Sequence, residues 1–174
     1  PNIIRKNRNS IAIIHDDDSE QTLRGITGDI FHFFCLGCRN VSKVFLPAGF
    51  DTAAFMQQME PFRGIIEHHK YANNYEYQKA VMMVNNLPFE DNGFLIMKHD
   101  TALASPVATI HYEFYQDEKT LLADLEPLLD KIQCIVSDSE SHKGFIKPGY
   151  SQFPELWEYA DNIDVVQFIK RLQD

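Results

Sequence analysis

Two cysteines three residues apart are the feature of this sequence whose chemistry most needs explaining. Cys35 and Cys38 flank a Leu-Gly pair, and His32 precedes Cys35 at the same spacing. A redox pair is expected at the amino terminus of a helix, where the dipole lowers a thiol pKa, whereas this pair follows an expected helix. A zinc site needs a fourth ligand; other histidines are available, but no second paired motif accompanies this one. Both interpretations, thiol redox and zinc binding, stay open.

A single nucleophilic thiol at Cys38 is the third interpretation. A free thiol is only a few per cent ionised at neutral pH, yet its thiolate is a strong nucleophile. Gly37 leaves room beside the sulfur for a substrate carbonyl, and the backbone N–H of Cys38 is placed to stabilise an oxyanion. The competing structural interpretation is a packed core cysteine, the commonest role of an isolated one. From the pattern alone, the core cysteine is favoured.

Strands and helices alternate around these residues. Short apolar runs predict buried strands, and apolar residues spaced by three and four predict helices. Strands are expected at 10–14, 41–46, 93–98, 107–114 and 132–136, and helices at 23–34, twice within 51–87, at 117–131 and at 164–172. The alternation predicts an α/β fold with a mainly parallel sheet and helices on both faces, in one domain over residues 1–174.

Composition excludes several classes of protein. Hydrophobic residues make up 44% of the chain, including 13 Phe and 7 Tyr, which excludes intrinsic disorder. A net charge of −9 with mixed signs argues against a nucleic-acid partner. No run reaches the roughly 18–20 apolar residues of a membrane span, and no signal peptide is visible. Three cysteines are too few for a disulfide scaffold, so a reducing, cytoplasmic setting is expected. The chain begins at Pro1, which suggests a piece of something longer.

Several runs resemble the aldehyde dehydrogenase superfamily around its nucleophile. The resemblance covers residues 9–14, 16–18, 33–38 and 42–47, and Cys38 falls on the nucleophile position. Ser105-Pro106-Val107 resembles the Gly-Pro-Val segment of the family, and 155–161 resembles its closing segment. More closely, GCRNVSKVFLP, HHKYANNYEYQKA, DNGFL, ASPV, KIQCIVS and PELWEYAD are similar to a shortened branch of acyl-CoA reductases, related to the fatty-acyl reductase component of bacterial bioluminescence.

The resemblance implies an oxidoreductase with a catalytic Cys38. Its thiolate would attack an acyl-CoA, release CoA and form a thioester intermediate, which hydride from NADPH or NADH would reduce to an aldehyde. Such an enzyme excludes water from the intermediate. The apolar residues Phe31, Phe33 and Phe34 fit that need, and they fit an ordinary core equally well.

The resemblance also marks what this chain lacks. The Glu that precedes the Gly-Pro-Val segment in the family is absent, since Thr101 to Ala104 stand there. The dinucleotide-binding half, with the general base and the oxyanion-hole Asn, is expected upstream, so cofactor-binding residues stay unassigned and this fragment alone is expected to be inactive. The implied partner is an acyl-CoA substrate, and self-association as a homo-oligomer stays open.

Other residues have a functional and a structural interpretation. Arg39 would favour the thiolate or bind a CoA phosphate, but pairing with a local acid is favoured. His68, His69 and Lys70 would meet CoA phosphates, but a solvated helix end is favoured. Cys134, inside an apolar run, is expected in the core.

The last candidates lie near the two ends of the chain. Asp16 to Asp18 would bind a cation or, as favoured, mark the start of a helix. Cys35 is a bystander or a resolving thiol under oxidation. Trp157 and Tyr159 are expected to pack the tail onto the sheet. A non-catalytic domain that kept the fold is a further alternative to the enzyme.

Overall fold

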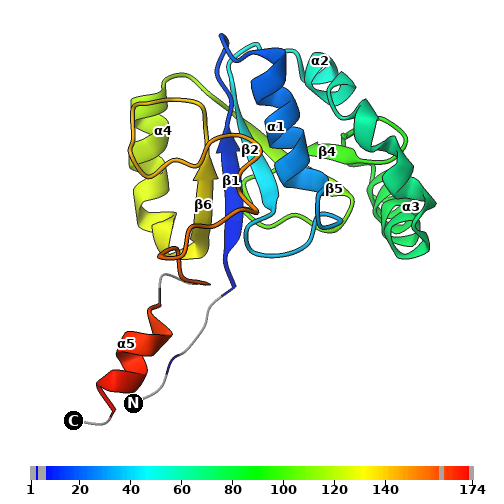
Figure 1. The fold of residues 1–174 in the computed structure, drawn as a ribbon. Helices are drawn as coiled ribbons and strands as arrows, with labels where there is room; N and C mark the ends of the chain where they lie inside the picture. The colour runs from blue at the N-terminus through cyan, green and yellow to red at the C-terminus, as the bar shows by residue number, and fades with distance from the viewer. Residues whose placement is uncertain (1–2, 4–6, 161–162, 173–174) are drawn as a thin grey trace.

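A computed structural model describes residues 3, 7–160 and 163–172 of the chain. The described residues form one six-stranded sheet with the order β3-β4-β5-β2-β1-β6, in which all neighbours run parallel except the edge pair β3–β4 (Figure 1). The strands are β1 (Asn9–Ile13), β2 (Val41–Pro47), β3 (Glu90–Asp91), β4 (Ile96–His99), β5 (Thr109–Tyr115) and β6 (Ile132–Val136). The predicted α/β class with a mainly parallel sheet is confirmed.

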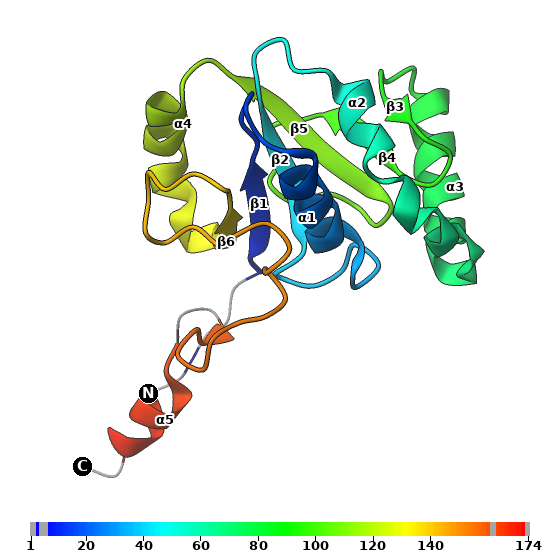
Figure 2. The same cartoon turned by 45° about the horizontal axis from the view of Figure 1, so that its top comes forward.

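Helices cover both faces of this sheet. They are α1 (Glu20–Phe31), α2 (Thr52–Gln57), α3 (His69–Val84), α4 (Glu118–Leu125) and α5 (Val165–Lys170), with 3-10 segments at Glu60–Glu67 and Glu126–Lys131. Side chains alternate along a strand, so Ala12 packs with α1 while its neighbours Ile11 and Ile13 pack with α4. Figure 2 shows α1 and α2 on one side of the strands and α5 extending away from them.

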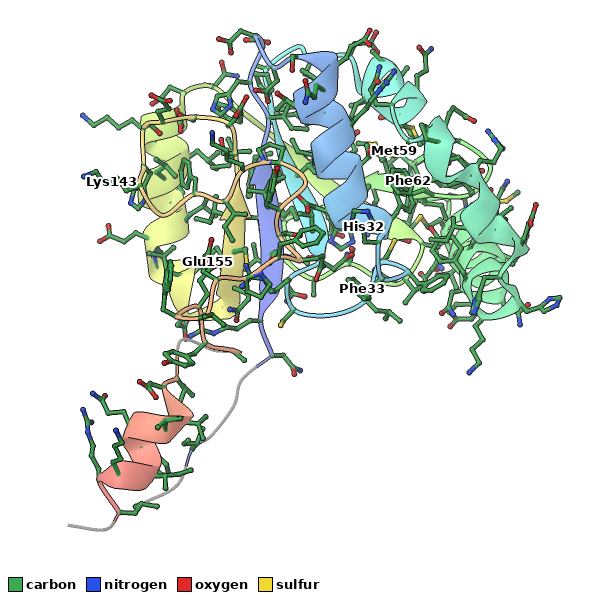
Figure 3. The ribbon with its side chains drawn as sticks, in the orientation of Figure 1. His32, Phe33, Met59, Phe62, Lys143 and Glu155 are labelled. Atoms are coloured by element: carbon green, nitrogen blue, oxygen red, sulfur yellow. The ribbon has the colours of Figure 1, made fainter. Side chains whose placement is uncertain are left out.

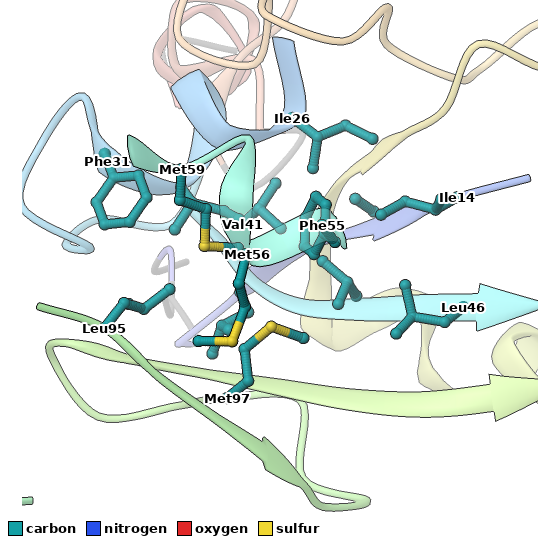
Figure 4. Close-up of a cluster of buried hydrophobic side chains, with 14 of the residues drawn as sticks. Ile14, Ile26, Phe31, Val41, Leu46, Phe55, Met56, Met59, Leu95 and Met97 are labelled. Atoms are coloured by element: carbon teal, nitrogen blue, oxygen red, sulfur yellow. The ribbon is translucent and has the colours of Figure 1, made fainter. Parts of the chain in front are cut away.

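The larger apolar core lies between the sheet and α1, α2 and the first 3-10 segment. Figure 4 shows buried side chains of this core; among the labelled ones are Ile14, Val41 and Leu46 from the region of β1 and β2, Ile26 and Phe31 from α1, and Phe55 and Met56 from α2. The Phe31 ring stacks on Phe62 with centroids 5.1 Å apart. Because Ile26, Ile30 and Phe31 are buried in this core, the last turn of α1 is held against the sheet, and the turn with Cys38 comes next in the chain.

Element ends differ from the sequence prediction for identifiable reasons. The helix expected to stop near residues 36–38 ends at Phe31, because Phe34 and Cys35 adopt left-handed backbone angles, with φ of +57° and +58°. The helix expected over 117–131 divides into α4 and a 3-10 segment at Pro127, which lacks a backbone N–H donor. The short antiparallel strand β3 was not predicted.

The segment after β6 is fastened to α1. Asp29, wholly buried in α1, accepts hydrogen bonds from the backbone N–H groups of Gly149 (2.7 Å) and Ser151 (3.0 Å) and from the Ser151 hydroxyl (2.8 Å). Gly25, one turn earlier, lies so close to Pro148 that a Cβ there would sit 2.7 Å from its carbonyl carbon. Within the described residues, no helix is long and apolar enough to cross a membrane.

Candidate functional site

Cys38 lies in a tight turn between α1 and β2. Hydrogen bonds from Leu36 N–H to the Phe33 carbonyl and from Asn40 N–H to the Gly37 carbonyl close the turn, at 3.0 and 3.2 Å. The Cys38 carbonyl accepts a 2.8 Å bond from the hydroxyl of Ser10, a buried residue of β1. The turn is therefore attached to the middle of the sheet while the Cys38 residue stays exposed.

Gly37 gives the turn its shape and keeps the thiol accessible. Its φ of +98° favours glycine, and no atom lies within 4 Å of the place a Cβ would take. The backbone N–H of Cys38 donates to no acceptor within the described residues. An incoming carbonyl and its developing oxyanion require room at the turn and an N–H donor next to the sulfur.

A cleft of about 550 Å³ contains this turn in its wall. The cleft lies at the amino-terminal edge of the parallel strands, which is the lower edge of the sheet in Figure 1. Its lining comes from four separate segments: Asn7, Arg8 and Asn9; Cys35 to Cys38, Asn40 and Ser42; Ala104, Ser105 and Val107; and Ala160. The Ser-Pro-Val segment that the sequence resemblance singled out thus borders the same cleft as Cys38.

The three thiols have different surroundings. Cys38 is exposed, Cys35 is partly covered and Cys134 is buried in β6, as expected for a core cysteine. Loss of solvent raises the pKa of Cys35 to about 11, although a hydrogen bond with the Tyr71 hydroxyl, 3.8 Å away, lowers it. Burial also raises the pKa of Cys134. Cys38 is the thiol that solvent and a substrate reach.

The His-x-x-Cys-x-x-Cys run is not assembled into a metal site. His32 packs edge-on against Phe62, with ring centroids 6.0 Å apart, and Cys35 faces Tyr71. In the part of the chain that the structure describes, no group of three His, Cys, Asp or Glu side chains is arranged to hold a metal ion. The zinc interpretation therefore has no support from the geometry.

Arg39 turns away from the neighbouring thiol. Its Nε donates to the Ser151 carbonyl, and its guanidinium lies 3.4 Å from the Glu158 carboxylate. This agrees with the favoured interpretation that Arg39 pairs with an acid. Together with Asp29, the contact fastens the tail segment beside the Cys38 turn, so that Ala160 reaches the cleft.

The loop between β4 and β5 forms another wall and is fastened by buried polar side chains. The Ser42 hydroxyl donates to the Leu103 carbonyl at 2.7 Å. Lys43, 1% exposed, donates to the carbonyls of Asp100 (3.0 Å) and Thr101 (2.8 Å) and to the carboxylate of Glu113. Two of the three ammonium donors thereby hold the loop, whose continuation through Ala104 and Ser105 lines the cleft, and the third binds Glu113 of β5.

Asn40 is a residue of this cleft that sequence reasoning missed. Its side-chain N–H donates to the Val41 carbonyl at 3.1 Å, while its Oδ1 is buried without a hydrogen-bond partner among the described residues. In the sequence, Asn40 is one more polar residue in a loop. Only the packing at the start of β2 makes it 2% exposed and leaves its oxygen unpaired.

The aromatic residues near Cys38 and in the tail do not all lie where the sequence interpretations placed them. Phe31 belongs to the core, whereas Phe33 (labelled in Figure 3) and Phe34 are exposed. None of the three lines the Cys38 cleft. Of the two interpretations that the sequence left open, an ordinary core fits Phe31, and shielding of the site has no support from these positions. Trp157 is 71% exposed and Tyr159 is also exposed, so the prediction that they pack onto the sheet is wrong as well. The tail is held by Asp29 and Arg39 instead, through polar contacts.

The histidines after the first 3-10 segment lie outside the cleft. His68 ends that segment, His69 begins α3, and both are exposed together with Lys70. The His68 ring lies 4.6 Å from that of Phe34. These positions fit the favoured interpretation of a solvated helix end.

The carboxyl-terminal edge of the sheet carries the acidic residues. The N-cap of α1 is Ser19, whose hydroxyl accepts from the Thr22 N–H at 3.1 Å, so the cap is the residue after the aspartates. Asp18 accepts from the His15 N–H at 2.9 Å, and burial raises its pKa. Asp17 and Asp18 line a small cleft with Asp138. As elsewhere in the described residues, this cluster does not form a group fit to hold a metal.

Comparison with known proteins gives weak structural likenesses. No protein-family model matches the chain, and no curated protein matches it. An aldehyde dehydrogenase of Mycobacterium tuberculosis complexed with NAD+ is 10% identical with a TM-score of 0.47, covering 78% of this chain. A methylmalonate-semialdehyde dehydrogenase of Sinorhizobium meliloti 1021 complexed with NAD is 10% identical with a TM-score of 0.48, covering 79%. This chain spans 35% of each of those chains.

Proposed function

We propose that this chain carries the nucleophilic thiol of an acyl-CoA reductase, with Cys38 as the residue that accepts the acyl group. One observation carries the proposal: the exposed thiol lies in the wall of a cleft, at the position where the sequence resembles the nucleophile turn, and its backbone N–H has no acceptor within the described residues. Cys134 is buried, Cys35 is partly covered although it borders the same cleft, and burial raises the pKa of both. A core cysteine, favoured by the pattern alone, does not describe the surroundings of Cys38.

The acyl transfer uses groups of this chain. The Cys38 thiolate attacks the thioester carbonyl carbon, and the carbonyl electron pair moves onto oxygen, where the Cys38 N–H can donate a hydrogen bond. When the carbonyl re-forms, the bond between carbon and the CoA sulfur breaks, and CoA leaves as a thiolate that takes up a proton. The product is an acyl thioester on Cys38. One thioester replaces another, so no activated water is needed.

The residues of this chain do not fit a dinucleotide at the place a doubly wound sheet usually binds one. There, the turn after the first strand is glycine-rich and the pyrophosphate meets the helix amino terminus. Here Asp16, Asp17 and Asp18 stand in that turn and would repel phosphate. In the proposed activity a nicotinamide cofactor supplies hydride to the acyl group, and its binding site is assigned to no residue of this chain.

Acylation of Cys38 is the direct test. The 174-residue chain, with its thiols reduced, is incubated with a long-chain acyl-CoA and analysed by intact-protein mass spectrometry and peptide mapping. We expect one acyl group on the Cys38 peptide, removable by hydroxylamine, in the wild type and in Cys35→Ser, and none in Cys38→Ser. If iodoacetamide alkylates Cys38 readily while acyl-CoA leaves its mass unchanged, the thiol is accessible but not an acyl acceptor, and the proposal is wrong.

A further inference from the structure

The turn before Cys38 exposes three large apolar side chains. Phe33 is 56% exposed, Phe34 40% and Leu36 55%. A single exposed apolar residue is normal on a protein surface, whereas a group of them marks a place where an apolar ligand or partner binds. Leu36 lines the same cleft as Cys38, and Phe33 and Phe34 do not. Leu36 is therefore the exposed apolar residue of this turn that a molecule bound in the cleft contacts.

Leu36 belongs to an apolar part of the cleft lining that comes from two segments of the chain. We call it the apolar wall; its residues are Cys35, Leu36, Ala104 and Val107. A hydrogen bond from the backbone N–H of Ala108 to the Cys35 thiol joins the two segments, and Cys35 and Val107 both pack against a buried cluster formed by α3 and β4. The wall is thus supported from behind, while Leu36 and Ala104 stay exposed on it.

A different part of the lining is polar. Asn7, Arg8 and Asn9 come from the segment at the start of β1 and supply two amides and a guanidinium. A hydrocarbon chain laid on such groups removes water from them without replacing its hydrogen bonds, which costs free energy. The same chain laid on apolar side chains gains free energy by leaving water, whereas phosphate groups are attracted to a guanidinium.

The two arms of an acyl-CoA differ in the same way. The acyl arm is a hydrocarbon, and the CoA arm carries amides and phosphates. In acyl transfer the acyl carbonyl carbon becomes bonded to the Cys38 sulfur, so the first carbons of the chain lie beside the turn that contains Leu36. The apolar wall is the part of this cleft whose chemistry matches the acyl arm.

We propose that Leu36, with the apolar wall around it, binds the aliphatic chain of the acyl group and makes Cys38 prefer longer straight chains over short ones. This rests on the proposed function and extends it by naming the residue that selects the substrate. Contact with the chain lowers the free energy of the transition state relative to the free reactants, so it raises the second-order rate of acylation. The CoA arm makes no use of this contact, so the effect depends on the length of the acyl chain alone.

Three acyl-CoAs of increasing length test the role of Leu36. Butanoyl-, hexanoyl- and octanoyl-CoA share the CoA arm and differ by two CH₂ groups at each step. Second-order rate constants for acylation of Cys38 are measured on the reduced 174-residue chain by peptide mapping with fragmentation, which separates Cys38 from Cys35. A CH₂ group fully removed from water gains about fourfold, and one covered on a single side about twofold, so we expect octanoyl-CoA to acylate Cys38 about tenfold faster than butanoyl-CoA.

Substitutions of two equally exposed residues separate the apolar wall from the rest of the turn. Leu36→Ser is expected to reduce this preference by about threefold or more, and Leu36→Met, which keeps an apolar side chain, to retain it. Phe33→Ser is the matched control, because Phe33 is as exposed as Leu36 and does not line the cleft. It should keep the wild-type preference. Each preference is a ratio of two rates in one protein, so a general loss of activity does not change it.

The outcomes distinguish the role of Leu36 from the proposed function. Acylation of wild-type Cys38 at equal rates by the three acyl-CoAs overturns the role of Leu36 and leaves the proposed function standing. An unchanged preference in Leu36→Ser, or an equal loss in Leu36→Ser and Phe33→Ser, also overturns that role, because the acyl chain then makes no specific use of the apolar wall. Failure of all three acyl-CoAs to acylate a Cys38 that iodoacetamide alkylates overturns both proposals.

Discussion

At the scale of single residues, burial raises the pKa of two thiols of this chain, Cys35 and Cys134. The thiolate is the nucleophile, so a raised pKa removes reactivity at neutral pH. Cys35 lies against Tyr71, whose hydroxyl in turn donates to the Phe94 carbonyl at 3.0 Å. Desolvation outweighs that polar contact and raises the pKa of Cys35. Cys35 and Cys38 therefore have different chemistry although both lie in one turn.

The pH dependence of alkylation should separate these two thiols. A pKa of about 11 for Cys35, against an ordinary value of 9.0, leaves it about a hundredfold less thiolate than an ordinary thiol near pH 8. Reaction of Cys35 with iodoacetamide is therefore expected to rise only as the pH approaches 11, whereas Cys38 is exposed to the reagent. Peptide mapping after short pulses at pH 7 to 11 measures both rates in one sample.

Tyr71→Phe gives the control for this prediction. The Tyr71 hydroxyl lowers the pKa of Cys35, so its removal should slow alkylation of Cys35 further and leave Cys38 unchanged. Equal rates for Cys35 and Cys38 at pH 8 would contradict the assignment of Cys35 as a covered thiol.

The sequence predicted some properties of these residues and not others. The spacing of the cysteines and the resemblance selected Cys38, and the apolar run around Cys134 correctly predicted a buried residue. Asn40 gave no signal, because an unpaired oxygen depends on which groups the fold places around it. The exposure of Trp157 was equally unpredictable, since an aromatic side chain is usually buried where a partner surface exists.

At the scale of elements, α1 connects the core, the tail and the Cys38 turn. Its Ile26 and Ile30 are buried against the sheet, and its Asp29 receives the tail. The periodicity predicted this helix correctly, but its end depends on left-handed angles at Phe34 and Cys35, which no residue type there requires. The sequence therefore predicted the helix and not the geometry of the turn that follows.

The two glycines of α1 give a matched pair of substitutions. At Gly25, a Cβ would lie 2.7 Å from the backbone of Pro148, so Gly25→Ala must displace the tail. We expect it to lower the free energy of unfolding by about 1–3 kcal/mol, the usual cost of overpacking. At Gly28, a Cβ would meet only the His32 side chain at 3.1 Å, and a gain in helix propensity of about 0.5–1 kcal/mol is expected to offset that contact.

Urea unfolding of both variants measures this difference. Gly28→Ala should unfold at a urea concentration equal to or above that of the wild type, and Gly25→Ala clearly below it. If both variants unfold alike, the close approach of α1 and Pro148 does not hold the tail, and the account of tail docking is wrong.

At the scale of the whole molecule, the cleft depends on segments that meet only in the folded chain. The amino ends of β1 and β2, the loop before β5 and the tail each contribute to its lining. In a parallel sheet these ends lie at one edge, which the predicted fold class already implies. The sequence did not predict how the loop before β5 and the tail are held in place. Lys43 and Asp29 look like ordinary charged residues in the sequence, and only the structure shows that they are buried and bind a loop carbonyl and a tail N–H.

Two truncations test the fastening of the tail. A chain ending at Ile146 loses the donors from Gly149 and Ser151 to the Asp29 carboxylate and both tail partners of Arg39. Hydrogen bonds to a charged group contribute about 1.5–3 kcal/mol each, partly replaced by water after truncation. We therefore expect a loss of about 3 kcal/mol, or about 6–12 °C in Tm, measured by thermal unfolding.

A chain ending at Ile163 is the matched control. It removes α5, which has no buried residue, and keeps every described contact between the tail and α1. Its Tm is expected to stay within a degree or two of the full chain, because surface changes away from such contacts contribute about 0.5 kcal/mol or less. Acylation of Cys38 should be kept by the chain ending at Ile163 and reduced in the chain ending at Ile146. The first still contains Ala160, which lines the cleft, and the second lacks it. Equal stability of the two truncated chains would mean that the tail is not part of the folded unit.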